Sequence, residues 1–207
     1  MQIGFPLELQ SVLVNISFLI ITIIVNQMGL IASASLDVVG KLMEFLMLPA
    51  IALGSALASL IALNVGAKQT LKYAIMISLA FAIVVTTICE IDGTILTRIF
   101  TNNQDVIKNG ALYLKMYSID CLLTSFHFCI NGYLNGYERT VFTMVHSLVA
   151  AFVGRIPLTL LFSKIPNVTL FHMGIAAPLS TMISLVMIFI YFLINHLTHV
   201  HSMVRIN

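Results

Sequence analysis

Six apolar stretches, each long enough to cross a bilayer as a helix, constrain the fold of this chain more than any other feature. Only 9% of the residues are charged and 59% are hydrophobic, whereas a soluble domain carries about 25% charged residues. The sequence therefore predicts an all-α, polytopic protein of the cell membrane with the lipid bilayer as its solvent. The six helices are expected at residues 7–28, 42–65, 73–95, 112–135, 141–162 and 173–195.

The short connectors predict one compact lobe over residues 1–196, followed by a polar tail at 197–207. Small and polar residues at 29–40 are expected to form a turn between the first two helices. Pro49 lies inside the second helix and should bend it. The three cysteines all lie in apolar segments, where they are expected as packing residues. The net charge of +2 includes no Lys/Arg cluster, so a nucleic-acid partner is not expected.

The fourth stretch, 112–135, carries a continuous polar stripe. Placed at about 100° per residue, seven polar side chains fall within about 80° of arc. A charged side chain at the bilayer centre costs at least about 2.5–3.5 kcal/mol, so an acid and a histidine on one stripe indicate a pathway for an ion or a solute. The stripe consists of Tyr113, Tyr117, Asp120, Thr124, His127, Asn131 and Asn135. The candidate pathway residues among them are Tyr117, Asp120, Thr124, His127 and Asn131.

Three residues on other helices are further candidates. Asn15 belongs to a second polar stripe on residues 7–28, for which hydrogen bonding between helices and lining of the pathway both stay open. Glu44 is either a pathway acid or a partner of Lys41 near the interface. Arg155, two residues before a proline, is expected to extend toward the nearer interface, to pair with an acid on another helix, or to contact substrate.

The sequence has no signature of an enzyme or of a metal centre. The GxSxG, HExxH and GxxxxGK[ST] motifs are absent. Asp120 and His127 are two turns apart, about 10 Å along a helix axis, which is too far for a direct hydrogen bond. We therefore expect no catalytic residue, no metal site and no bound cofactor. The stripe fits the binding of protons or cations better than covalent chemistry.

The distribution of basic residues leaves the orientation open. An even number of helices places both termini on the same side of the membrane. The positive-inside rule favours Lys and Arg on the cytoplasmic side, and the count leans slightly toward termini on the outside. With cytoplasmic termini, Lys68, Lys72, Arg139 and Arg205 would be inside, and Lys41, Arg98, Lys108, Lys115 and Lys164 outside.

Several short motifs, in order along the chain, resemble the multidrug and toxin extrusion (MATE) family. GFPLELQ at 4–10 resembles the opening of that family's seventh helix, and LPAIALGSALASLIALNVGAK at 48–68 is similar to its eighth. NGYLNGYERT at 131–140 resembles the exit from the tenth helix. The remaining matches are IFTNNQDVIKNGALYL at 99–114 before the tenth helix, and RIPL at 155–158 and GIAAPLS at 174–180 in the last two.

The resemblance implies one six-helix lobe of a twelve-helix transporter, with both termini cytoplasmic. It also implies export of cationic, amphipathic drugs in exchange for Na⁺ or H⁺. Some members have acids near the positions of Asn15 and Thr124, whereas here the acid is Asp120, one turn away on the same stripe. The coupling acid is therefore either Asp120 or a residue of the other lobe.

A single lobe needs a partner, either a separately encoded first lobe or a second copy of this chain. The alternatives to a half-transporter are a flippase-like transporter of lipid-linked sugars, suggested by Arg155 alone, and a truncated or non-transporting fragment.

Overall fold

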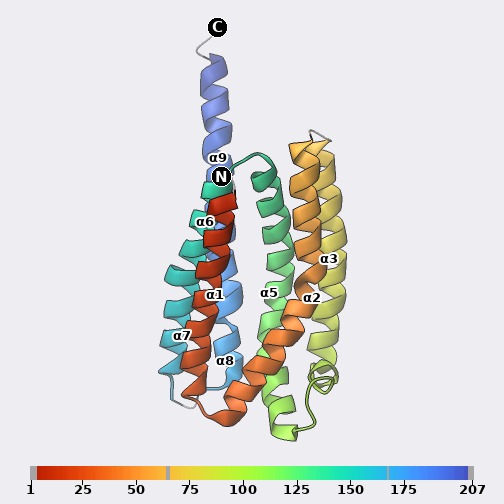
Figure 1. Ribbon diagram of the computed structural model, residues 1–207, viewed down its shortest axis with the longest axis vertical. Helices are drawn as coiled ribbons and strands as arrows, with labels where there is room; N and C mark the ends of the chain where they lie inside the picture. The colour runs from red at the N-terminus through yellow and green to blue at the C-terminus, as the bar shows by residue number, and fades with distance from the viewer. Residues whose placement is uncertain (1–3, 64–65, 167, 205–207) are drawn as a thin grey trace.

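The computed structural model describes residues 4–63, 66–166 and 168–204, which are helical along most of their length (Figure 1). The described residues contain no strand, so the predicted all-α membrane fold is confirmed. The elements are α1 (Gly4–Asn26), α2 (Leu30–Ala62), α3 (Ala67–Asp92), α4 (Thr94–Thr97), α5 (Gln104–Gly136), α6 (Thr140–Val149), the π-helix η1 (Ala150–Arg155), α7 (Ile156–Ser163), α8 (Leu170–Gly174) and α9 (Ala176–Val204).

Five segments are long and apolar enough to cross a membrane: α1, α2, α3, the continuous run Thr140–Ser163, and Leu170–Ile194. The helix α5 is as long as α2 but more polar, because it carries the stripe described above. Together these segments account for the six long helices expected from the sequence.

The turn predicted at 29–40 is wrong, because α2 begins at Leu30. The serines that suggested a turn form hydrogen bonds that are compatible with a helix. Ser35 is fully buried and donates to the carbonyl of Ile31 at 2.7 Å and to that of Val106, on α5, at 3.2 Å. Val39 is also fully buried. This part of α2 is therefore packed helix, and the chain reverses at Gly29, whose φ is 106°.

Two other boundaries extend beyond the predicted ones. The predicted 112–135 helix begins at Gln104, where the Asn103 side chain accepts hydrogen bonds from the backbone N–H groups of Asp105 and Val106. The predicted 173–195 helix begins with α8 and continues as α9 to Val204. The tail expected at 197–207 is thus helical as far as Val204, and its last three residues lie outside the described residues.

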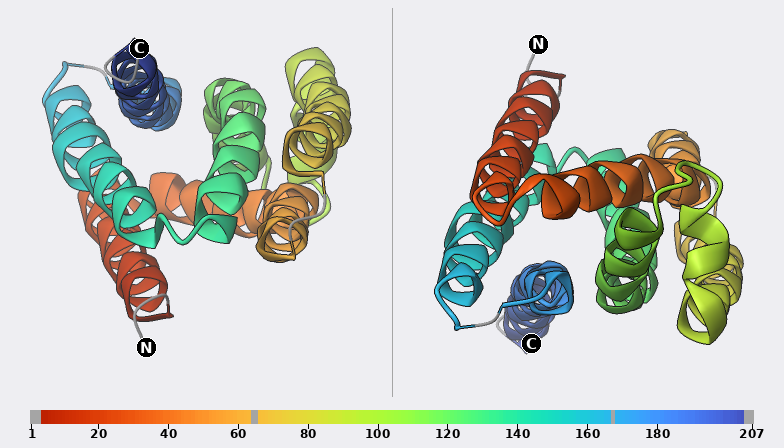
Figure 2. Two further views of the ribbon diagram at one scale, coloured as in Figure 1. Left: turned by 90° about the horizontal axis from the view of Figure 1, so that it is seen from above. Right: turned by 90° about the horizontal axis from the view of Figure 1, so that it is seen from below.

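The helix α5 occupies the middle of the lobe. It packs against α2 and α3 on one side and against α8 and α9 on the other. The views along the bundle in Figure 2 show α1, the α6–α7 run and α9 as one group, with α2 passing from α1 to α5 and α3. The first helix begins, and the last ends, at the same end of the bundle (Figure 1).

The contact between α2 and α5 depends on glycine. A Cβ on Gly132 would lie 2.1 Å from the carbonyl oxygen of Gly54, so neither helix has space there for a side chain. Leu57 and Cys129, near this crossing in the two helices, are buried in one hydrophobic cluster. Large apolar side chains on the outer surfaces of α1, α3 and α9 are exposed, as expected of helices that face lipid.

Candidate functional site

The polar stripe of α5 faces the inside of the lobe. Asp120 is 2% exposed and Asn131 is 7% exposed, and Tyr117, Thr124 and His127 are half-buried. Two groups of contacts connect this stripe to the helices that follow it. One is centred on Asp120 and the other on His127.

Asp120 forms an ion pair with Arg155. Arg155 Nη2 lies 4.0 Å from Asp120 Oδ2, which is the limit of an ion-pair contact and longer than a direct charge-assisted hydrogen bond. Thr124 and Thr181 lie next to the carboxylate. Asp120 Oδ1 is buried and makes no hydrogen bond with the described residues. Because a buried carboxylate oxygen normally has a partner, the hydroxyls of Thr124 and Thr181 are the groups placed to donate to it.

Arg155 contacts three elements besides its own. It is the last residue of η1, and its Nε donates to Ser180 Oγ on α9 at 3.2 Å. Its guanidinium lies 4.8 Å from the centroid of the Phe18 ring on α1, within the range of a cation–π contact. The side chain is 16% exposed. Of the three roles considered for Arg155, the structure shows pairing with an acid on another helix.

A second polar cluster joins α5, α6 and α9 without a formal charge. Ser184 Oγ lies 3.0 Å from His127 Nε2 and 2.7 Å from His146 Nδ1. The amide nitrogen of Asn131 lies 3.4 Å from the same His127 Nε2. The two imidazole rings are 5.4 Å apart and perpendicular. We call His127, Asn131, His146 and Ser184 the histidine cluster.

The direction of these hydrogen bonds depends on the tautomers of the two imidazoles. If the Asn131 amide donates to His127 Nε2, that nitrogen carries no hydrogen, and its one lone pair is shared between Asn131 and Ser184. A serine hydroxyl has a single hydrogen. If Ser184 donates that hydrogen to His127 Nε2, then His146 Nδ1 is the nitrogen that donates to Ser184. The cluster is therefore consistent with two neutral imidazoles that hold three helices together.

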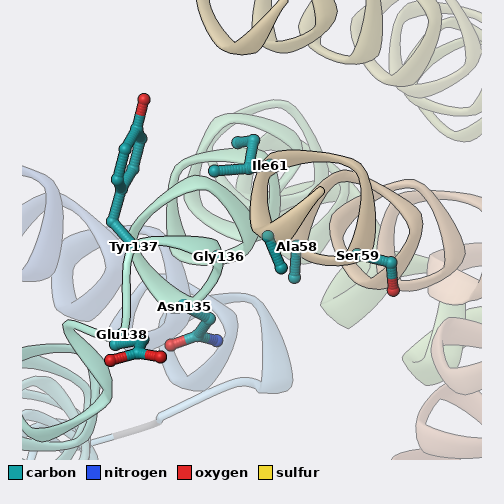
Figure 3. Close-up of a pocket in the computed structure, with 8 residues that line it drawn as sticks. Ala58, Ser59, Ile61, Asn135, Gly136, Tyr137 and Glu138 are labelled. Carbon is teal, nitrogen blue, oxygen red and sulfur yellow. The ribbon is translucent and has the colours of Figure 1, made fainter. Parts of the chain in front are cut away.

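The remaining stripe residues make local contacts. The Tyr113 and Tyr117 rings stack, with centroids 5.6 Å apart. Thr143, on α6, donates to Asn135 Oδ1 at 2.8 Å. Asn135 also borders a surface pocket of about 490 Å³ where α2 and α5 end. In Figure 3 the Asn135 and Glu138 side chains lie together at its edge while Tyr137 points away. This pocket does not include Asp120 or the histidine cluster.

Two sequence candidates lie outside both groups of contacts. Asn15 is exposed on α1, and Glu44 is exposed on α2. Within the described residues Glu44 forms no ion pair with Lys41. Both side chains are therefore on the surface of this lobe rather than among the buried polar contacts.

Sequence reasoning missed the partners of the stripe on other helices. A signal for them was present, because Ser180, Thr181 and Ser184 are polar residues on one face of an otherwise apolar segment. His146 is fully buried, as an isolated histidine in an apolar helix suggests. Gln10, on α1, also joins this region by donating to Ser147 Oγ at 3.0 Å.

A comparison with protein families shows which family the chain belongs to. The family model MatE matches residues 6–161. The chain belongs to the MatE family. No curated protein matches the chain.

Solved transporters share the fold at low sequence identity. A MOP superfamily transporter from Pyrococcus furiosus is 18% identical with a TM-score of 0.81, over 90% of this chain and 42% of that one. A MATE protein solved in complex with MaL6 is 14% identical with a TM-score of 0.83, over 92% and 44%. A variant of the Vibrio cholerae MATE transporter VcmN is 17% identical with a TM-score of 0.79, over 88% and 43%.

The chain thus spans less than half the length of these solved transporters. Over the part that it covers, it has the fold of a MATE transporter. Together with the five apolar helices, the family shows a multi-pass membrane protein with a transporter fold.

Proposed function

We propose that this chain is one lobe of a secondary active transporter that exports cationic drugs or other small organic solutes in exchange for H⁺ or Na⁺. The observation on which the proposal depends is Asp120, a carboxylate buried on the long helix α5 and 4.0 Å from the guanidinium of Arg155. An ionisable residue inside a membrane protein most often marks an ion or substrate pathway.

In this proposal Asp120 is the group that takes up the coupling ion. A proton, a sodium ion or the cationic group of a drug would compete for the same carboxylate. A ligand shifts the equilibrium between inward- and outward-open states only by its differential affinity for them. Tyr117, Thr124, His127 and Asn131 would supply polar contacts along the pathway, and the exposed Asn15 would face it from α1.

Alternating access requires two lobes that move against each other. We therefore infer that this lobe works with a first lobe, supplied by a separate chain or by a second copy of this one. We expect both ends of this chain on the cytoplasmic side. No enzymatic step and no resident cofactor form part of the proposal, in keeping with the transporter family.

Replacing Asp120 with Asn tests the proposal. The variant should lose ethidium efflux in cells that express this chain together with a complementary first lobe. The matched control is Asp105→Asn, which removes an exposed carboxylate from the same helix and should leave efflux intact. Unchanged efflux in the Asp120 variant, at equal membrane abundance, would contradict the assignment of Asp120.

A second candidate is suggested by Arg155. A half-buried cation facing the interior is a feature of a site for acidic head groups, and we keep a flippase of lipid-linked sugars as the alternative. Reconstituted vesicles with labelled lipid-linked sugar distinguish the two activities. Movement of the lipid without ethidium transport would favour the flippase, and neither activity would favour a non-transporting fragment.

A further inference from the structure

When Asp120 is ionised, its charge and that of Arg155 add to zero. Asp120 is the one carboxylate within ion-pair distance of Arg155 among the described residues, and Arg155 is its one cationic partner. The neighbouring groups, Ser180, Thr181 and Phe18, are uncharged. A proton or a monovalent cation that binds Asp120 therefore leaves the site with one positive charge, and no other described carboxylate lies within ion-pair distance of Arg155 to balance it.

We propose that Arg155 binds an anionic group whenever Asp120 is occupied by a proton or a cation. The anionic group is either a free monovalent anion, such as chloride, or a carboxylate of the transported solute. The inference rests on the proposed role of Asp120 and extends it, since it gives the site a second ligand of opposite charge.

The geometry of the guanidinium supports an anion site. Arginine has five N–H donors, and the hydrogen bond that the described residues give it uses Nε, which donates to Ser180 Oγ at 3.2 Å. Nη2 is 4.0 Å from Asp120, too far for a close hydrogen bond. The donors on the Nη side are therefore available. At 16% exposure the side chain can still be reached by a solute.

The contacts that hold Arg155 do not depend on Asp120. Ser180 belongs to α9 and Phe18 to α1, and both would keep the guanidinium in place after the carboxylate is neutralised. A half-buried cation that loses its partner is unfavourable, although less so than a fully buried one. An anion at Arg155 removes that cost, so anion binding at Arg155 and cation binding at Asp120 must favour each other. Thermodynamic linkage makes this coupling reciprocal.

Few other charged groups near the site could compensate the positive charge of Arg155. The helix α9 has no charged residue from Ala176 to Ile194, and α6 has none besides histidine. His127, Tyr113 and Tyr117, all on α5, lie within electrostatic reach of Arg155. Glu44, on α2, is exposed and forms no ion pair with Arg155 among the described residues. Glu8, on α1, is exposed as well.

Chloride binding to the purified chain in lipid nanodiscs tests the inference without any drug. The measurement is ³⁵Cl line broadening in NMR at pH 8. Asp120→Asn imitates the neutralised carboxylate and should bind chloride roughly 5–150-fold more tightly than the wild type, the usual range for coupled sites. In the wild type, lowering the pH should strengthen chloride binding. The double variant Asp120→Asn/Arg155→Gln should lose it.

A second measurement identifies the source of the anionic group. Tetraphenylphosphonium is a cation without an acid, and carboxymethyl-triphenylphosphonium carries a carboxylate on the same core. If a free anion binds, tetraphenylphosphonium affinity should fall when isethionate replaces chloride at constant ionic strength. If the solute supplies the group, the carboxylate analogue should bind more tightly in an Arg155-dependent manner.

The outcomes separate this inference from the proposed function. Equal chloride binding by the wild type, Asp120→Asn and the double variant would overturn the anion site, whatever happens to the organic cations. Failure of tetraphenylphosphonium to bind, with Arg155-dependent chloride binding intact, would overturn the cationic substrate but keep the anion site. Arg155→Lys retains the positive charge and is the variant to use if Arg155→Gln does not fold. Chloride binding should survive in Asp120→Asn/Arg155→Lys.

Discussion

The two sides of α5 contact their neighbours in different ways. Toward α2 the closest contact is between glycines, with Gly132 and Gly54 so close that no side chain fits between them, and the Ser35 hydroxyl adds a hydrogen bond to the carbonyl of Val106. Toward η1, α6 and α9 the contact is made by polar groups, namely the Asp120–Arg155 pair and the histidine cluster. Backbone packing of the first kind admits a single arrangement, because interiors are close-packed.

Polar contacts of the second kind can be exchanged for others. When a proton or an ion binds, or when a hydroxyl group changes its partner, one polar contact is replaced by another and no cavity opens. We therefore expect α5 to form one rigid unit with α2 and α3, and to change its contacts with α1, α6, α7 and α9 when a ligand binds. The predictions below test this difference, beginning with the change expected to have the largest effect.

Arg155→Leu should have the largest effect on stability. It leaves the Asp120 carboxylate buried without a counter-charge, which costs about 3–5 kcal/mol. The measurement is the free energy of unfolding in mixed micelles at pH 8. Adding Asp120→Asn to Arg155→Leu should restore most of the loss, since no unpaired charge then remains. The control Arg139→Leu removes an exposed arginine and should change little. An equal loss in the single and double variants would show that packing, rather than charge, is what Arg155 provides.

Gly132→Ala should be next. The added Cβ would meet the Gly54 carbonyl oxygen at 2.1 Å, and overpacking of this kind costs about 1–3 kcal/mol. The matched control is Gly40→Ala in α2, where no atom lies within 4 Å of the new Cβ. That control should stabilise the helix by about 0.5–1 kcal/mol. Similar midpoints of thermal unfolding for the two variants would refute the rigid contact between α2 and α5.

Ser184→Ala should have a smaller effect because it removes neutral hydrogen bonds. Hydrogen bonds between membrane helices contribute about 0.6–1.7 kcal/mol, and this change affects His127 and His146 together. Ser55→Ala is the control, since Ser55 is exposed and donates within its own helix to Ile51. A loss as large as that of Arg155→Leu would mean that the histidine cluster carries a charge.

Asn15→Ala should change stability least, by under about 0.5 kcal/mol, because the side chain is exposed on α1. If Asn15 faces the pathway, ethidium efflux should nevertheless decrease. Val12→Ala, an exposed residue on the same helix, serves as the control for both assays. Normal efflux in Asn15→Ala would remove Asn15 from the pathway.

The sequence predicted the polar face of α5 because periodicity is a local property. Asp120, Thr124, His127 and Asn131 repeat at helical spacing, and burial of Asp120 followed from the cost of exposing it to lipid. The partners on other helices were missed. The polar face formed by Ser180, Thr181 and Ser184 signals polar partners for α9, but it does not show that two histidines 38 and 57 residues from Ser184 meet its hydroxyl. The early start of α2 was missed because residues 29–40 are small and polar, whereas Ser35 is buried and donates to the carbonyl of Val106 on α5.

The π-helix η1 determines which way the second half of its membrane span faces. His146 and Arg155 are nine residues apart, and at about 100° per residue a regular α-helix would turn them to opposite sides. The wider winding of Ala150–Arg155 takes up part of that rotation, so both side chains reach α9, at Ser184 and Ser180. A deletion of one residue in this segment would therefore be as disruptive as loss of the arginine itself. The spacing between the two residues is therefore part of what allows one membrane span to contact α9 at two successive turns.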